Sequence, residues 1–362
     1  MPAALKQTLY ISERSQLQRA SPSKEPPMAA DTITLSLDQI RELALTTLKA
    51  NGCNDENASA VAETITTAER DGSSSHGLFR LPGYVASLKS GKANGSAKPS
   101  VSRPKPAVVL VDNDNGFAPL GIVAGRDDLI DAARSQGIAF MALVKSHHFA
   151  ALWHEVEPLC DVGLCAFACT AHTASVAPAG GKKKLFSTNP VAFGWPRKDQ
   201  PPVVFDMATA AMARGEIMLA ARDGHDVPLG AGLDANGNPT QDPNAILEGG
   251  VQLPFGDYKG SAIALMVELL AAALIGERFS YEATEADNKD GGPARGGEFI
   301  LAIDPSTTAG EGWLGHSEGL FGKMLAMDGV RLPGDRRYGN RAKSQHQGVA
   351  VPAELIEKIN AL

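Results

Sequence analysis

The segment from Asp71 to Arg80, with the sequence DGSSSHGLFR, brings together residue types that could carry chemistry. It holds a hydroxyl on Ser75, an imidazole on His76 and a guanidinium on Arg80. If the chain is helical here, His76 and Arg80 are one turn apart and share a face. Imidazole exchanges a proton near neutral pH, and guanidinium holds a carboxylate through two hydrogen bonds. The segment therefore predicts a site for a small 2-oxo or 2-imino acid.

Two other interpretations of this segment remain open. His76 could cap a helix while Arg80 makes a surface ion pair, which is the common outcome for an arbitrary pair at this spacing. A hydrolase would use Ser75 as the nucleophile and His76 as the base. Neighbouring residues rarely place the hydroxyl on the adjacent imidazole, however, and the sequence has no G-x-S-x-G elbow.

A metal site is a third interpretation, because His147 and His148 are adjacent and His154 and His172 follow them. Adjacent residues at a strand end point to opposite sides, and no carboxylate stands at helical ligand spacing from both histidines. We therefore predict a site without a metal. A metal-dependent hydrolase would instead lose activity to chelators.

The composition is that of a globular protein. The chain has 362 residues, of which 43% are hydrophobic and 21% charged, and this length predicts about two or three domains. A net charge of -7 and the absence of any long basic run argue against a nucleic-acid partner. The longest apolar run, 262–275, contains Glu268 and is too short to span a membrane, so we expect a buried helix there.

The cysteines and the N-terminal residues bear on the cellular compartment. Cys53, Cys160, Cys165 and Cys169 form no C-x-x-C pair, and three of them alternate with apolar residues along a predicted strand. We expect reduced thiols in the core of a cytoplasmic protein. Residues 1–30 are polar, mixed in charge and without the apolar region of a secretory signal, so we expect a disordered arm.

Helices and strands alternate along the chain with short connections. Ser36 and Gln39 form a capping-box pattern for a helix that ends near residue 51. We expect further helices at 55–70, 76–90, 121–136, 149–162, 259–276, 314–327 and 352–361, and strands at 107–111, 138–144, 164–169, 191–195, 203–205 and 298–304. Residues 223–254 and 285–297 should form loops. The pattern predicts a mixed α/β or α+β fold.

The two commonest phosphate-binding signatures are absent from the sequence. No G-x-G-x-x-G follows a predicted strand, and no G-x-x-x-x-G-K-[ST] occurs. A nucleotide would therefore bind in another way. Three segments offer suitable groups: 145–149 and 254–260, each before a predicted helix, and the turn with Arg336 and Arg337.

An ordered set of motifs resembles the malate/L-lactate dehydrogenase-type oxidoreductase family, which is unrelated to Rossmann-fold lactate dehydrogenases. The motifs are DGSSSHGLFR at 71–80, SHHF at 146–149, STNP at 187–190, FDMAT at 205–209, PFGDYKG at 254–260 and LPGDRR at 332–337. The match runs from about residue 35 to the C-terminus. Within the family, the motifs are most similar to the branch of Δ1-piperideine-2-carboxylate/Δ1-pyrroline-2-carboxylate reductases.

The resemblance implies a fold and an assembly. The fold is α/β (mixed α+β), with a non-Rossmann nicotinamide-binding domain on a largely antiparallel sheet, a second α/β domain and a helical terminal region. We expect the NAD(P)H-binding domain at 106–309. Residues 31–105 together with 310–362 would form the helical region for substrate binding and dimerisation. The implied assembly is a homodimer.

The resemblance also implies a reaction and its residues. The reaction is NADPH-dependent reduction of a cyclic imino acid, giving L-pipecolate or L-proline, with NADH as the weaker cofactor. His76 would donate the proton, with Ser75 and Glu216 in a supporting relay. Substrate would be bound by Arg80, Thr188, Arg214 and Gly215. The cofactor would contact His148, Phe149, Ala150, Ala151, Leu152, Asp206, Met207, Ala208, Asp257, Tyr258, Lys259, Gly334, Asp335, Arg336 and Arg337.

Two residues depart from the reductase pattern. Glu216 stands where the relay has an aspartate, and Tyr258 stands where a histidine precedes the lysine of the F-G-x-x-K-G motif. Two rival functions also stay open. A 2-hydroxy-acid dehydrogenase of the malate, lactate or ureidoglycolate type would use the same His76 and Arg80 on a carbonyl. A non-catalytic protein would bind small acids in the same pocket.

Overall fold

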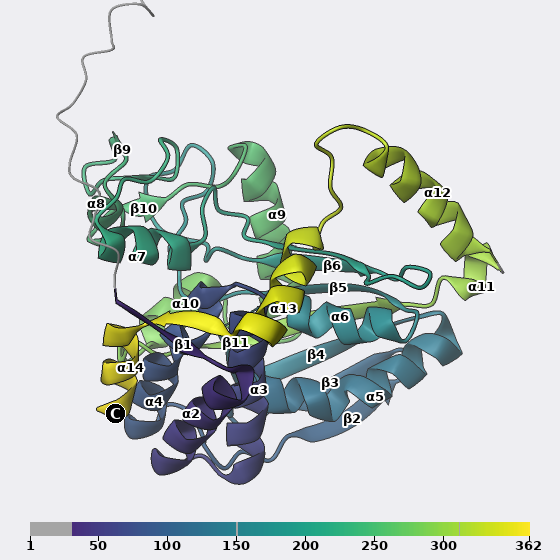
Figure 1. Ribbon diagram of the computed structural model, residues 1–362, viewed down its shortest axis with the longest axis horizontal. Coiled ribbons are helices and arrows are strands. Elements are labelled where there is room, and N and C mark those ends of the chain that lie inside the picture. The colour runs from purple at the N-terminus through teal and green to yellow at the C-terminus, as the bar shows by residue number, and fades with distance from the viewer. Residues whose placement is uncertain (1–30, 150, 311) are drawn as a thin grey trace, which may run out of the picture. The chain divides into compact units, whose positions relative to one another are not determined.

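A seven-stranded sheet forms the centre of the molecule in the computed structural model, which describes residues 31–149, 151–310 and 312–362. In spatial order its strands are β2 (Ser100–Lys105), β3 (Val108–Asp112), β4 (Ile138–His147), β11 (Arg295–Ile303), β5 (Cys165–Thr170), β6 (Val191–Trp195) and β7 (Val203–Met207) (Figure 1). Only β3 and β4 are parallel among these neighbours. The predicted mixed α/β fold with a largely antiparallel sheet is confirmed.

Helices cover both faces of this sheet. On one face, α5 (Ala118–Gln136) and α6 (Trp153–Asp161) pack against Ile300 and Ala302 of β11. On the other face, Phe299 packs against α9 (Tyr258–Glu268) and the π-turn Leu269–Ala273 that continues it. Successive side chains of a strand point to opposite faces, so β11 is buried from both sides. The central strands are therefore the most buried part of the fold.

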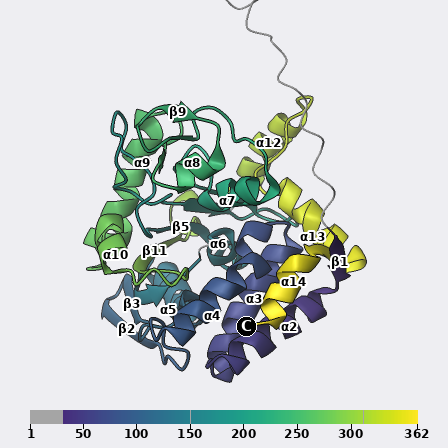
Figure 2. The same cartoon turned by 90° about the vertical axis from the view of Figure 1, so that its left-hand side faces the viewer.

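The helices near the N-terminus form a second core. The helix α2 (Leu37–Ala50) begins with the predicted capping box of Ser36 and Gln39, and α3 (Asp55–Arg70) packs against it. The strand β1 (Thr32–Leu35) pairs with β12 (Val349–Pro352), and α14 (Ala353–Asn360) contacts α4 (Leu81–Lys89) (Figure 2). Segments from both ends of the described chain thus pack together. The predicted domain boundaries stay a prediction.

The predicted helix 76–90 is wrong in its first part. The chain forms two separate 3-10 turns, Ser74–His76 and Leu78–Arg80, before α4 begins at Leu81. Gly77 interrupts the helix with φ -89° and ψ -137°. His76 and Arg80 therefore do not share a helical face. They approach one site because the two turns are folded back on α3.

Several other boundaries differ from the sequence prediction. The helix α6 begins at Trp153 and not at residue 149. The segment expected to be a loop at 223–254 contains the short helix α8 (Pro243–Leu247). It also contains a three-stranded sheet made of β8 (Gly232–Leu233), β9 (Pro239–Thr240) and β10 (Val251–Gln252). The turn expected near 335 is the start of α13 (Asp335–Gln347). The remaining helices are α7 (Arg214–Asp223), α10 (Ser280–Ala286), α11 (Ser306–Ala309) and α12 (Trp313–Leu325).

All four thiols are buried and unbridged, as predicted for core cysteines, and the predicted cytoplasmic compartment stays a prediction. Burial raises the pKa of Cys53 and of Cys165 to about 12, as for inert core thiols. Among the described residues, no helix is long and apolar enough to cross a membrane. The predicted arm at 1–30 lies outside the described residues.

Candidate active site

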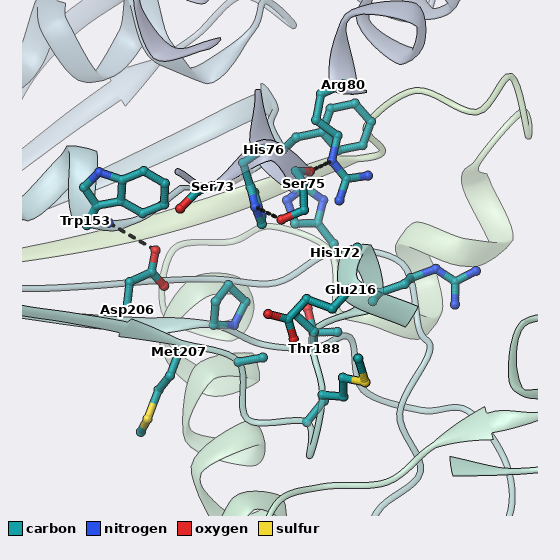
Figure 3. Close-up of a pocket in the computed structure, with 18 of the residues that line it drawn as sticks. Ser73, Ser75, His76, Arg80, Trp153, His172, Thr188, Asp206, Met207 and Glu216 are labelled. Carbon is teal, nitrogen blue, oxygen red and sulfur yellow. Dashed lines mark hydrogen bonds between the residues drawn. The ribbon is translucent and has the colours of Figure 1, made fainter. Parts of the chain in front are cut away.

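A cavity of about 1090 Å³ collects most of the predicted site residues (Figure 3). Its walls come from the turns before α4, the starts of α6, α7 and α13, the end of β7 and the loop at 287–294. The predicted residues that line it are Ser75, His76, Arg80, Phe149, Thr188, Asp206, Met207, Ala208, Arg214, Gly215, Glu216, Gly334, Arg336 and Arg337. We call the part with Ser75, His76, Arg80 and Thr188 the Arg80 end, and the part with Trp153, Asp206 and Arg337 the Trp153 end.

His76 is held by its neighbour Ser75 at the Arg80 end. The Ser75 hydroxyl lies 3.0 Å from Nδ1 of His76, so the expectation that adjacent residues would not make this contact is wrong. The 3-10 turn makes it possible. Burial, followed by the charges of Arg80, His148 and His172, lowers the pKa of His76 to about 3. The imidazole is therefore neutral at neutral pH before any ligand binds.

Arg80 is fixed in orientation before any ligand binds. Its Nε donates a hydrogen bond to the Ser75 carbonyl at 2.7 Å, and its guanidinium lies 4.7 Å from the centre of the Phe149 ring. Its terminal nitrogens form no hydrogen bond within the described chain and are left for a ligand. Gly215 makes room for them, because a Cβ there would lie 3.0 Å from Nη2. The guanidinium can thus hold a carboxylate through its two terminal nitrogens.

Glu69 of α3 explains why the chain turns here. Its buried carboxylate accepts a hydrogen bond from the Leu78 backbone N–H at 2.8 Å and closely approaches Gly77. A Cβ at Gly77 would overlap this carboxylate, so only glycine fits between the two turns. Burial raises the pKa of Glu69 to about 7. No role was predicted for Glu69, since nothing in its spacing indicates a contact nine residues away.

Asp71 connects the turn to more distant elements. Its carboxylate pairs with Arg70 and Arg341, each at 2.8 Å, and accepts a hydrogen bond from the Trp153 indole at 3.1 Å. Burial raises the pKa of Asp71, but the hydrogen bonds and charges of Arg341 and Arg70 outweigh this and leave it below its usual value. One carboxylate therefore joins α3, α6 and α13 beside the cavity. From the sequence, Asp71 was only the first residue of the motif at 71–80, and these partners were not predicted.

His172 is a cavity residue that sequence analysis considered only as a metal ligand. It follows β5, and its ring points toward Ser75 and Arg80 (Figure 3). Its Nε2 is buried and has no hydrogen-bond partner in the described part of the chain. Burial, then the charges of His148 and Arg80, lowers the pKa of His172 to about 3. The only indication in the sequence was that His172 comes just after a predicted buried strand, because loops after strands often carry functional residues.

The Trp153 end combines one carboxylate with arginines. Asp206 accepts a hydrogen bond from the Trp153 backbone N–H at 3.2 Å, and burial is the main cause that raises the pKa of Asp206 to about 6. The Arg337 guanidinium lies 4.9 Å from the centre of the Trp153 ring. Nη1 of Arg337 is buried without a partner among the described residues. This nitrogen is free to bind an anion.

These features fit a nicotinamide dinucleotide. The cavity is as large as those that hold drug-sized ligands. Gly334, the N-cap of α13 with φ 99°, lines the cavity together with Arg336 and Arg337, and Nη1 of Arg337 has no partner among the described residues. Such a helix start with an adjacent cation suits a phosphate. The residues present therefore match the predicted cofactor.

Some predicted cofactor residues lie outside the cavity walls. The buried residues His148, Ala151 and Leu152 do not line the cavity. Asp257, Tyr258 and Lys259 lie at the exposed start of α9, with Tyr258 67% exposed, and Asp335 accepts a hydrogen bond from the Leu332 N–H at 2.8 Å. Ala150 is not among the described residues. Contact of these residues with a cofactor stays a prediction.

Glu216 lines the cavity, but it is exposed and forms no hydrogen bond to Ser75 or His76 in the described structure. In Figure 3 its carboxylate points toward Thr188. Its part in a proton relay therefore stays a prediction. Arg214, in the first turn of the same helix, also lines the cavity, and burial lowers its pKa.

An imidazole and a guanidinium that face a dinucleotide-sized cavity suit hydride exchange with a small acid, which is the chemistry of an oxidoreductase. The chain belongs to the malate/L-lactate dehydrogenase family, whose model matches residues 35–360. The predicted family membership is confirmed.

Comparison with individual proteins gives the same family. The chain is 47% identical over 335 residues to a Δ1-pyrroline-2-carboxylate reductase of Ancylobacter novellus, covering 92% of this chain and 98% of that protein. It is 39% identical over 327 residues to a (2R)-3-sulfolactate dehydrogenase (NADP+) of Chromohalobacter salexigens, covering 90% and 97%. The crystal structure of Δ1-piperideine-2-carboxylate reductase from Pseudomonas syringae superposes with a TM-score of 0.87 at 44% identity, covering 91% of this chain and 99% of that one.

Proposed function

We propose that this protein reduces Δ1-piperideine-2-carboxylate to L-pipecolate and Δ1-pyrroline-2-carboxylate to L-proline, with NADPH as the reductant. The observation that carries the proposal is the placement of His76 and Arg80 at the same end of the cavity, each held by Ser75. The relatives named as reductases of these imines support the choice of substrate. We also propose a cytoplasmic homodimer.

Arg80 and Thr188 set the position of the substrate. The terminal nitrogens of Arg80 bind its carboxylate, and the Thr188 hydroxyl at the same end offers a further hydrogen bond. When bound, the reduced nicotinamide supplies a hydride to C2 of the imine. Because Arg80 is already held by Ser75 and Phe149, the carboxylate is received without reordering the guanidinium. Such prior orientation contributes much of the rate gain in two-reactant reactions.

His76 provides the proton that the substrate nitrogen needs. With the Ser75 hydroxyl donating to Nδ1, the neutral imidazole carries its proton on Nε2, which is then the nitrogen left for the substrate. A bound carboxylate offsets the charge of Arg80, one of the causes of the low pKa of His76, and so favours the protonated imidazole. A larger fraction of His76 is therefore protonated, and able to donate its proton, when substrate is present.

NADPH is the preferred cofactor in this proposal. Arg336 and Arg337 line the Trp153 end, where α13 begins, and they provide two cations for the additional phosphate of NADPH. The unpartnered Nη1 of Arg337 supports this assignment. We expect weaker use of NADH.

A second candidate is a 2-hydroxy-acid dehydrogenase, because the relative from Chromohalobacter salexigens is named as one and is NADP+-dependent. His76 and Arg80 would serve a carbonyl oxygen in the same way as an imine nitrogen.

Loss of NADPH absorbance with different substrates tests the proposal. The cyclic imine formed from D-lysine should be reduced with a kcat/KM at least about 100-fold above those for pyruvate and oxaloacetate, a difference of about 3 kcal/mol. The His76→Ala variant is the negative control, which gives the background rate of NADPH loss for each substrate. Faster reduction of either 2-oxo acid would favour the dehydrogenase, and no turnover of any substrate would contradict both candidates.

A further inference from the structure

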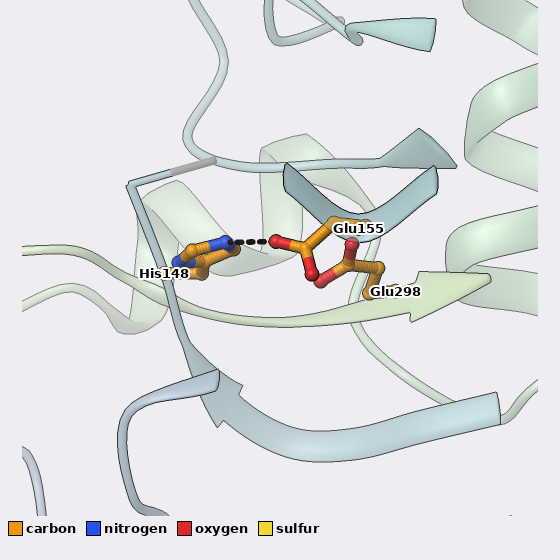
Figure 4. A group of neighbouring side chains, drawn as sticks. All are labelled: His148, Glu155 and Glu298. Carbon is orange, nitrogen blue, oxygen red and sulfur yellow. Dashed lines mark hydrogen bonds and ion pairs between the residues drawn. The ribbon is translucent and has the colours of Figure 1, made fainter. Parts of the chain in front are cut away.

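Behind the cavity wall, three ionisable side chains meet inside the protein. His148 follows β4, Glu155 belongs to α6 and Glu298 to β11, and these residues are only 4%, 2% and 2% exposed. Figure 4 shows the three side chains pointing toward one another. One ligand atom from each lies within 4.8 Å of the others. None of them lines the cavity.

Glu298 occupies an unusual place for a carboxyl group. The strand β11 is the central strand of the sheet, and Glu298 follows a register shift after Gly296. By alternation it faces the same side as Ile300 and Ala302, which belong to the core beneath α5 and α6. In the described chain, no lysine or arginine pairs with it.

Several carboxylate oxygens of this cluster have no hydrogen-bond partner among the described residues. His148 Nε2 lies 3.2 Å from Oε1 of Glu155, which satisfies one side of that carboxylate. Oε2 of Glu155 and both oxygens of Glu298 have no donor among the described residues. An ionised carboxylate buried without donors or a cation is very costly, so the group normally binds a proton instead.

We propose that Glu298 is protonated in the folded protein and that its hydroxyl donates a hydrogen bond to Oε2 of Glu155. The three side chains then form a continuous series, from Glu298 through Glu155 to His148. The one unpartnered oxygen of Glu155 gains a donor in this way. A single bound proton thus removes the charge of Glu298 and links the two carboxyl groups through atoms already in place.

The surrounding charges support a proton at this position. Burial, followed by the charges of Glu155 and Asp206, raises the pKa of Glu298 well above its usual value. The ionisable groups around it in the described structure are His148, Glu155, Asp206 and the Cys169 thiol of β5, and of these four only His148 could become a cation. A metal ion would need further ligands beyond these three side chains, since one side of Glu155 is already occupied by His148.

Glu298 is therefore a positioning residue for the site. Through Glu155 it fixes His148, next to the cavity residue Phe149. Because it is protonated, it also adds no negative charge near Asp206 of the Trp153 end. This second role rests on the proposed function, which places an anionic cofactor there.

The pH dependence of stability tests the proposal without any activity measurement. The unfolded chain ionises Glu298 near its ordinary pKa, whereas the folded protein keeps it protonated. Folding is then favoured below the unfolded pKa, and this stability is lost as pH rises toward the folded pKa. Glu298→Gln keeps a hydrogen-bond donor but cannot ionise. From pH 6 to pH 8, the unfolding constant of the wild type relative to Glu298→Gln should rise by about 100-fold, tenfold per pH unit.

Equilibrium urea unfolding gives these constants. Glu63→Gln is the matched control, because the Glu63 side chain is 56% exposed. The unfolding constant of the wild type relative to this control should not change with pH. A ratio independent of pH would overturn the proposal. So would a stoichiometric metal ion found by elemental analysis in the wild type and lost in Glu298→Gln.

Infrared spectroscopy of the wild type keeps the proposal testable if the variant does not fold. At pH 9, Glu69 with a pKa of about 7 and Asp206 with a pKa of about 6 are ionised. A protonated carboxyl band that remains, and shifts in D2O, is the expected result. Its absence would contradict the proposal. Neither urea unfolding nor infrared spectroscopy depends on reductase activity. The proposed protonation of Glu298 and the proposed function can therefore be disproved independently of each other.

Discussion

At the Arg80 end of the cavity, the two reactive side chains come from one stretch of the chain, whereas the Trp153 end is assembled from three distant segments. Ser75, His76 and Arg80 hold one another through a hydroxyl–imidazole contact and an Nε–carbonyl bond. At the other end, Trp153, Asp206 and Arg337 meet only in the folded molecule.

The two ends also differ in how their polar groups are satisfied. The Arg80 end keeps the terminal nitrogens of Arg80 and one ring nitrogen of His76 for a ligand, and their other polar atoms are held by Ser75. The Trp153 end leaves a buried nitrogen of Arg337 without a partner and holds Asp206 with its pKa raised to about 6. The first end suits chemistry that needs fixed geometry, and the second suits binding of a larger anion. Substitutions should therefore separate turnover from cofactor binding.

The largest expected effect is at His76. His76→Ala should lower kcat for the imine by about 10²- to 10⁴-fold, because an acid in contact with the reacting group is lost. KM for the imine and NADPH should stay within a few-fold of wild type, since Arg80 is retained. Steady-state kinetics give both values. Near-normal turnover in this variant would mean that the proton comes from elsewhere.

Arg80 should show the complementary change. Arg80→Ala should raise KM for the imine by about 30-fold or more, equal to at least about 2 kcal/mol, because the substrate carboxylate loses its cation. Arg80→Lys, which keeps the charge without the planar fork, should fall between wild type and alanine. Titration with pyrrole-2-carboxylate measures binding directly. Unchanged affinity in the alanine variant would place the carboxylate at another group.

Asp71 joins the two ends, so its loss should affect both. Asp71→Asn breaks a buried pair with Arg341 and should cost about 3 kcal/mol of unfolding free energy. Because the pKa of Asp71 is lowered in the folded protein, this stability is present above the unfolded pKa and is lost as pH falls through the lower folded value. The difference between wild type and variant should therefore shrink below about pH 4. Urea unfolding at several pH values measures it, and a constant difference would contradict this role.

The smallest expected effect is at the Trp153 end. Arg337→Ala should raise KM for NADPH by about tenfold, the loss of one charge-assisted hydrogen bond of about 1.4 kcal/mol, with little change in KM for the imine. Arg222→Ala, which removes an exposed ion pair with Asp223, is the matched control. Equal losses for NADPH and NADH would show that Arg337 does not distinguish the two cofactors.

Sequence reasoning succeeded where the chemistry is local. The spacing of His76 and Arg80 and the motif around them were enough to predict one end of the cavity, and the apolar alternation predicted most strands of the sheet. The helical geometry assumed for that segment was wrong, because the interruption at Gly77 depends on Glu69 in another helix. Local spacing carries no information about such a contact.

Sequence reasoning failed where tertiary contacts decide the structure. The helix α13 has no buried residue and no apolar stripe, so it was predicted as a turn. It is held by Arg341, which pairs with Asp71 and Glu157. His172 and Glu298 were missed as members of polar clusters for a similar reason. Their partners come from other strands and helices, which only the fold brings together.

A crystal structure with NADPH and pyrrole-2-carboxylate would test the central claim most directly. We expect the carboxylate to accept hydrogen bonds from the terminal nitrogens of Arg80 and the ring nitrogen to lie within hydrogen-bonding distance of His76. The nicotinamide should lie against the ring, with its phosphates near Arg337. A complex in which His76 and Arg80 both point away from the bound ring would contradict the account.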